Sequence, residues 1–193
     1  MARPALHLAG DDEADALLSE DPLALLIGMV LDQQIPLEKA FRGPAELVAR
    51  TGRPLSAEEI AAMDPERLAE LFTRPPALHR FPGSMARRVQ ALCQTIVEGY
   101  GGRADAVWDD VVDAKELKNR LKALPGFGDQ KARIFIALLG KQLGVRPSGW
   151  QQMASPFGDP GSHRSVADIV DEPSLAQVRA TKKAMKAGPS PSG

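Results

Sequence analysis

The residues with the clearest potential for chemistry form the segment Leu124–Ala132, Leu-Pro-Gly-Phe-Gly-Asp-Gln-Lys-Ala, which separates two stretches of helical periodicity. Gly126 and Gly128 allow the backbone to turn tightly and to approach a partner closely. The helix that follows begins with N–H groups that have no partner inside the helix, and these groups, together with the helix dipole, favour a phosphate. The segment therefore predicts a site that recognises a phosphate backbone by shape and charge.

Four side chains of this segment have expected roles. We expect Leu124 and Phe127 to anchor the turn in the core. Gln130 and Lys131 lie at the start of the second helix, where a side chain can reach a backbone oxygen of nucleic acid. The alternative is an ordinary tight hairpin between two helices, in which the glycines serve only the turn.

The distribution of charge along the chain favours the same segment. The 193 residues carry a net charge of −1, which by itself argues against a general polyanion binder. Residues 1–73 contain six Lys and Arg against fourteen Asp and Glu, whereas residues 114–146 contain eight against two. A phosphate backbone could bind this basic stretch although the whole chain is nearly neutral. A solvated helix surface would show the same charges.

The hairpin segment resembles the helix-hairpin-helix motif, which usually reads Leu-Pro-Gly-hydrophobic-Gly followed by a helix. Leu25–Pro36, which ends in Asp-Gln-Gln-Ile-Pro, resembles an early helix of the helix-hairpin-helix DNA glycosylases, above all of the 3-methyladenine class. The two segments are about ninety residues apart, as in that superfamily, and the resemblance covers roughly residues 20–146. The chain is thus similar to the HhH-GPD base excision repair superfamily.

The resemblance implies an all-α, bilobal, glycosylase-like fold with a cleft between the lobes, the hairpin at one lip and residues 32–36 at the other. It implies duplex DNA as the partner and places Gln34 at the DNA interface, near the space that an everted base leaves. The implied function is that of a monofunctional DNA glycosylase for damaged, for example alkylated, bases. A non-catalytic protein that recognises lesions or bent duplex, and a helical protein-interaction domain, are the alternatives, so enzymatic activity is left open.

The chain departs from the superfamily where catalysis is expected. The superfamily places a catalytic Asp about 24 residues after the first Leu of the hairpin, and this chain has Ser148 there. Asp159 is our first candidate for a displaced acid and Asp168 our second, although both residue types often serve as caps. The amine of the glycosylase-lyases falls at Gln130, and Lys131 is rotated from that position by about 100°, so we expect no lyase activity and assign Lys131 to a phosphate.

Two aromatic residues lie in the Gly- and Pro-rich segment that follows the hairpin helix. Trp150 and Phe157 could stack on a base or fill the core beneath this loop. We favour core packing for Phe157 and leave Trp150 open.

Apolar periodicity and capping residues predict a wholly helical chain. We expect helix caps at Asp21, Ser56, Ser84, Asp113 and Asp129. The expected helices are one that starts at Pro22 and ends by Pro36, one over about 44–50, one that starts after Ser56, and others over about 64–71, 84–98, 114–123, 129–140 and 172–185. We expect one bilobal domain over residues 1–186 and a disordered tail over 187–193.

The composition excludes several classes of protein. With 44% hydrophobic and 25% charged residues the chain is typical of a soluble globular protein, and its longest apolar stretch, residues 23–31, is far below the roughly 20 residues that span a bilayer. The single cysteine, Cys93, excludes an internal disulfide and a protein-held iron–sulfur cluster, and we expect neither a metal site nor a cofactor. A monovalent cation at the hairpin is left open. The acidic segment near the N-terminus is unlike a secretory signal, so we expect a cytoplasmic monomer.

Overall fold

A computed structural model describes residues 6–188 of the chain. These residues are helical apart from loops and one isolated bridge between Asp113 and Ser148, so the expected all-α class is confirmed. The helices are α1 (Asp12–Glu20), α2 (Pro22–Leu31), α3 (Leu37–Thr51), α4 (Ala57–Ala62), α5 (Pro65–Thr73), α6 (Pro82–Tyr100), η1 (Ala104–Val107), α7 (Ala114–Lys122), α8 (Asp129–Gln142), α9 (Trp150–Ala154), η2 (Val166–Asp168) and α10 (Glu172–Ala187).

Side-chain caps explain where several helices begin. The Asp21 carboxylate accepts the N–H groups of Leu23 and Ala24 at the start of α2. Ser56 caps α4 through the N–H of Glu59, and Asp113 caps α7. These three caps were expected from the sequence and are confirmed, because each side chain satisfies an N–H that has no partner inside its helix.

Other expected boundaries are wrong. α6 begins at Pro82 and not after Ser84, since a proline is well suited to the first helical position, where no N–H is needed. α8 already includes Asp129, and its N-cap is Gly128, which has no side chain to cap the helix. The start of α8 therefore keeps the free N–H groups that an Asp cap would have satisfied.

Two further corrections, in the N-terminal part of the chain, concern α1 and α3. α1 was missed because its segment is mainly acidic, but Asp15 faces inward and accepts the N–H groups of Leu8 and Ala9. α3 begins at Leu37 and runs through Pro44, where the sequence predicted a start. Pro44 and Gly43 are buried, and a Cβ at Gly43 would overlap Leu31 of α2. Close packing of α3 on α2 therefore offsets the hydrogen bond that Pro44 cannot make.

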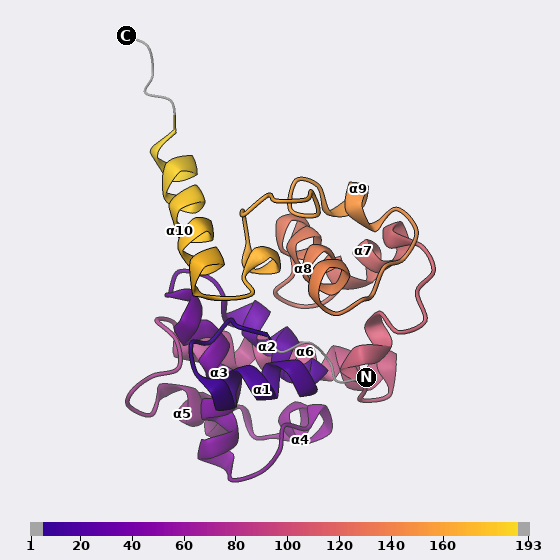
Figure 1. The fold of residues 1–193 in the computed structure, drawn as a ribbon. Coiled ribbons are helices and arrows are strands. Elements are labelled where there is room, and N and C mark those ends of the chain that lie inside the picture. Colours follow the sequence, from indigo (N-terminus) through magenta and orange to yellow (C-terminus); the bar gives the residue numbers. More distant parts are fainter. Residues whose placement is uncertain (1–5, 189–193) are drawn as a thin grey trace.

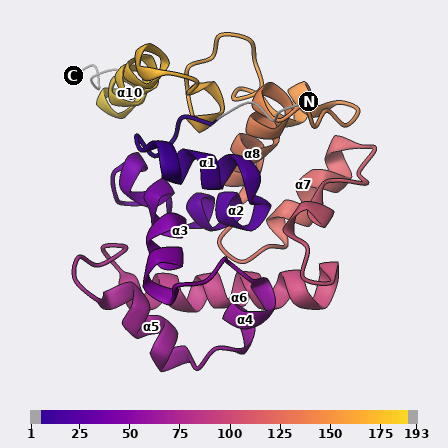
Figure 2. The same cartoon turned by 60° about the horizontal axis from the view of Figure 1, so that its bottom comes forward.

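The helices form two groups around a continuous hydrophobic core (Figures 1 and 2). In the first group, α2 is buried from Leu23 to Leu31 and packs against α1, α3 and α6, while α4 and α5 pack on α6. In the second, α8 packs against α7, α9 and η2. α10 contacts η2 and extends away from the body in Figure 1. This arrangement brings the end of α2 close to the start of α8.

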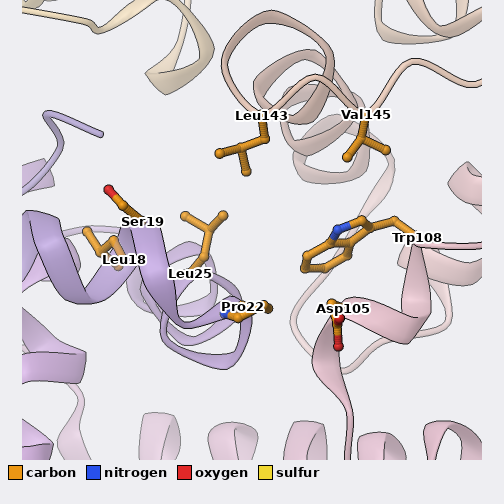
Figure 3. Close-up of a pocket in the computed structure, with 8 residues that line it drawn as sticks. All are labelled: Leu18, Ser19, Pro22, Leu25, Asp105, Trp108, Leu143 and Val145. Atoms are coloured by element: carbon orange, nitrogen blue, oxygen red, sulfur yellow. The ribbon is translucent and has the colours of Figure 1, made fainter. Parts of the chain in front are cut away.

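The interior of the described part of the fold contains a small cavity. This cavity of about 90 Å³ lies where Leu18 and Leu25 of the first group face Trp108, Leu143 and Val145 (Figure 3). It is smaller than the roughly 300 Å³ at which ligand pockets begin. Within residues 6–188, no helix has the length and apolar character needed to cross a membrane. Residues 189–193 of the expected tail lie outside the described residues.

Candidate nucleic-acid interface

The turn between α7 and α8 is held in one conformation by hydrogen bonds and packing. The N–H of Phe127 donates to the carbonyl of Leu124 at 3.1 Å. Gly126 has a φ of +88°, and a Cβ there would lie 3.1 Å from side-chain atoms of both Val30 and Arg88. Glycine is therefore required at this position both by the backbone conformation and by the close approach to α2.

Leu124 and Phe127 are buried, and the Phe127 ring packs edge-on against Phe135 of α8 with 5.9 Å between ring centroids. They anchor the turn in the core as expected. If these two residues contact DNA, they do so through their backbones. The exposed residues of the hairpin are Gly128 and Gln130.

The start of α8 is open to an anion. No side chain caps it, and the N–H groups of Asp129, Gln130 and Lys131 have no partner among the described residues. The carboxylate of Asp129 pairs with Lys118 at 2.7 Å, and Lys122 and Arg133 also pair with it. The hydrogen bond from Lys118 is the main reason that the pKa of Asp129 is held below its usual range. Three cations thus outweigh the single negative charge beside the helix start.

A cleft of about 730 Å³ separates this helix start from the end of α2. Residues 32–35 line one side and residues 128–131 line the other. Apolar side chains from Met29, Ile134 and Phe157 cover part of its wall, and the remaining lining residues are Arg164, Ser165, Val166, Lys182, Met185 and Lys186. The structure therefore brings together the two segments that the sequence singled out, and it adds basic residues from α10 that sequence reasoning missed.

Gln34 lies exposed at the α2 side of the cleft in a left-handed conformation, with a φ of +57°. Few residues other than glycine adopt this conformation unless their surroundings impose it. The residue before it is held by His79: Nδ1 of His79 accepts the N–H of Phe81, so Nε2 carries the proton and donates to the carbonyl of Gln33 at 2.9 Å. Burial lowers the pKa of His79, which keeps the ring in this neutral form.

Lys131 is half-buried and turns toward α2. Its Nζ donates to the carbonyl of Met29 at 2.5 Å. Burial is the main reason that the pKa of Lys131 is lowered, while Asp32 opposes this effect. Gln130, in contrast, is exposed at the lip of the cleft. Two neighbouring residues of the motif therefore face different surroundings.

Asp32 is the residue at this site that sequence reasoning missed. It follows α2 directly and lines the cleft, half-buried. Burial is the largest effect on it and raises its pKa, whereas Lys182 and Lys131 lower it. The signal was present in the sequence, since Asp32 adjoins Gln33 and Gln34, but an acid after the hairpin was expected instead.

The structure does not bring Asp159 or Asp168 into the cleft. Asp159 is exposed, and its backbone carbonyl accepts a hydrogen bond from Lys141. The side chain of Asp168 is buried and receives hydrogen bonds from Lys141 at 2.6 Å and from Ser162 at 2.7 Å. Both carboxyl groups lie outside the set of residues that line the cleft. Asp168 has a structural role in the loop before α10.

Ser148, at the position of the expected acid, also lies elsewhere. Its N–H donates to the carbonyl of Val112, and its carbonyl accepts the N–H of Ala114, the first residue of α7. It lines a separate hollow beside Asp113 and Lys118. Trp150 is partly buried and packs against the core, and a Cβ at Gly140 would overlap its ring. Phe157, which we favoured as a core residue, packs on the core and also lines the cleft.

An all-helical fold with this hairpin and a cleft beside it is typical of helix-hairpin-helix repair proteins. The sequence matches the family described as HhH-GPD superfamily base excision DNA repair protein over residues 27–187. Because the match covers most of the chain, the protein belongs to this superfamily, and its fold resembles that of the HhH-GPD DNA glycosylases. No curated protein matches the sequence.

Solved structures with a similar fold include two of endonuclease III bound to DNA. One is a trapped covalent intermediate with an estranged adenine and the other a non-covalent complex; each gives a TM-score of 0.46 and 17% identity, covering 89% of this chain and 73% of that chain. A thermostable thymine-DNA glycosylase gives a TM-score of 0.44 and 14% identity, covering 73% of this chain and 68% of that chain. Among the described residues, no group of three or more His, Cys, Asp or Glu side chains could hold a metal ion.

Proposed function

We propose that this protein binds duplex DNA and hydrolyses the N-glycosidic bond of an everted, damaged base, as a monofunctional DNA glycosylase. The observation that carries the proposal is the uncapped start of α8, which opens onto a cleft with Gln34 on its other side. A helix start of this kind accepts a phosphate, and a cleft of this volume lies within the range of ligand pockets, roughly 300–1,000 Å³.

The charge around the cleft supports binding to a phosphate backbone. Lys118, Lys122 and Arg133 surround the start of α8, and Lys182 and Lys186 project from α10 on the cleft side. Contacts of backbone N–H groups and lysines with phosphates carry no sequence information. We therefore expect binding that weakens with salt and is nearly independent of DNA sequence.

We propose hydrolysis, with water as the nucleophile, because the hairpin carries no amine at the position that a lyase uses. A lyase would need an amine that attacks C1′ of the sugar, and Gln130 occupies that position of the motif. The neighbouring Lys131 is engaged with the Met29 carbonyl. We propose an alkylated purine as the substrate, because such a base is already cationic and leaves more readily than uracil or an oxidised base.

A substitution at Gly128 tests the anchoring role of the helix start. Gly128 is exposed, has an ordinary extended backbone conformation, and has open space where a Cβ would lie. Gly128→Asp supplies the missing cap and should stabilise the protein by a few tenths of a kcal/mol, about 0.3 kcal/mol. The same carboxylate occupies the place of a phosphate, so the affinity for duplex DNA, measured by fluorescence anisotropy, should fall about tenfold or more.

Ser56→Asp is the matched control, because it adds the same charge at the N-cap of α4, away from the cleft. We expect it to leave DNA affinity nearly unchanged. If Gly128→Asp binds DNA as well as the wild-type protein does, the start of α8 is not the anchor. Base release is then measured on duplexes with one alkylated purine, one uracil or one oxidised base under single-turnover conditions.

A non-catalytic DNA-binding protein is the second candidate function. It is favoured by Ser148, which stands where the superfamily has its acid and lies outside the cleft. Tight binding to lesion duplexes without release of any base would support it. A monovalent cation at the hairpin also remains a proposal; none of the steps above requires it.

A further inference from the structure

The cleft contains two carboxyl groups, and they differ in how they are used. Asp32 and Asp129 line it from opposite sides. Asp129 is paired with Lys118, Lys122 and Arg133. The side chain of Asp32 makes neither a hydrogen bond nor an ion pair within 4.0 Å among the described residues, and only more distant charges act on it. One carboxylate of the cleft is therefore available for a ligand.

Elsewhere in the described chain, aspartates with a comparable degree of burial have structural partners. Asp21 caps a helix, Asp15 accepts two backbone N–H groups, and Asp168 is paired with Lys141 and Ser162. These three carboxylates have hydrogen-bond partners within the fold, whereas no partner contacts the carboxylate of Asp32 among the described residues.

The position of Asp32 is unfavourable for a negative charge that only stabilises the fold. It is the C-cap of α2, where the helix dipole repels an anion. Partial burial adds a desolvation cost, and no donor offsets that cost. The other charged groups that line the cleft are Asp129 and Lys131 on α8, Arg164 before η2, and Lys182 and Lys186 on α10. A polar group kept under these conditions is a candidate for function.

We propose that Asp32 is the catalytic carboxylate of this cleft, in place of the acid that the superfamily has after the hairpin. The inference rests on the proposed glycosylase function. Asp32 lines the cleft opposite Gln130 and lies two residues before Gln34. In the proposed complex, the sugar of an everted nucleotide between these residues lies beside it. Its negative charge stabilises the positive charge that develops on the sugar as the bond to the base breaks.

The step balances without another reactant besides water. The C1′–N bond breaks, and its electron pair stays with the base, so a cationic alkylated purine leaves as a neutral molecule. A water oxygen forms the new bond to C1′. Asp32 accepts the proton of that water and then releases it to solvent.

Asp32→Asn tests the assignment because it keeps the shape and removes the charge. We expect single-turnover release of an alkylated purine to slow about 100-fold or more. Affinity for the duplex should stay equal or increase, because a negative charge leaves a phosphate-binding cleft. Asp159→Asn makes the same chemical change at an exposed site outside the cleft and should release the base at the wild-type rate.

The outcomes separate this inference from the function on which it rests. If the wild-type protein releases no base from any of the duplexes, the glycosylase proposal fails, and the assignment of Asp32 fails with it. If the wild-type protein releases the base and Asp32→Asn does so equally fast, only the assignment is overturned. A variant that unfolds or loses DNA binding would show a structural role and would also overturn it; thermal melting and anisotropy distinguish these cases. Asp32→Glu, which keeps the charge, should retain more activity than Asp32→Asn.

Discussion

The two sides of the cleft differ in the surroundings of their carboxylates. At the start of α8, Asp129 is partly exposed and paired with three cations. At the end of α2, Asp32 is half-buried and has no partner at bonding distance. The hairpin side is thus arranged to hold a polyanion without repulsion, and the α2 side keeps one charge free. In the proposed function, the hairpin side binds the DNA backbone and the α2 side acts on the nucleotide.

The largest effect on stability is expected where the two sides touch. Gly126→Ala puts a Cβ against Val30 and Arg88 in a backbone conformation that alanine disfavours, so it should destabilise the protein by about 1–3 kcal/mol. Gly128→Ala, two residues away in the same turn, meets open space and should change the stability by less than about 0.5 kcal/mol. Chemical denaturation of both variants measures the difference. Equal losses would mean that the contact with α2 does not determine the hairpin.

The glycines also show how much the sequence could predict. The hairpin was predictable because its turn depends on the local backbone conformation, which neighbouring residues such as Gly126 and Phe127 determine. Val30, which leaves little room for a Cβ at Gly126, is almost a hundred residues away in the sequence. This second reason for a glycine at position 126 therefore appears only in the folded chain.

The chemistry of the cleft was harder to predict than the hairpin. The sequence indicated Gln34 and Lys131, and Asp32 lies two residues before Gln34, but this proximity alone did not distinguish Asp32 from the other acidic residues, because burial and the absence of partners are tertiary properties. Asp159 was selected by its distance along the chain, and that distance says nothing about which way the loop faces. Lys182, Met185 and Lys186 could not be assigned to the cleft either, because the path of the chain before α10 carries no periodic signal.

The pH dependence of stability should separate the two aspartates. Burial raises the pKa of Asp32 in the folded state, so its contribution favours folding at low pH and is lost as the pH rises through that raised pKa. Lys118 lowers the pKa of Asp129, so its contribution is present at neutral pH and is lost as the pH falls through that lowered pKa. At pH 7, Asp32→Asn should raise the melting temperature or leave it unchanged, and Asp129→Asn should lower it. Parallel shifts of both variants would contradict the comparison.

The same raised pKa predicts how the proposed reaction depends on pH. Asp32 acts as a carboxylate, so base release should decline as the pH falls through its pKa, and this decline should begin at a higher pH than for an ordinary aspartate. DNA binding should not decline over this range, because protonation of Asp32 removes a repulsive charge. Single-turnover rates and anisotropy measured over the same pH series test the two statements independently.

The smallest effects are expected on α10, which extends from the body beside the cleft. An ion pair between Arg179 and Glu38 of α3 holds the helix against the body. Lys182 and Lys186 lie one turn apart on the side of α10 that lines the cleft. Lys183 is not among the lining residues. If both lysines neutralise phosphates, Lys182→Gln and Lys186→Gln should each reduce the slope of log affinity against log salt concentration by about 1, without a change in sequence preference. Lys183→Gln removes the same charge from the same helix and should leave the slope nearly unchanged. An equal change of slope in all three variants would mean that only the general positive charge of α10 matters, because the side of the helix on which each lysine lies is then irrelevant.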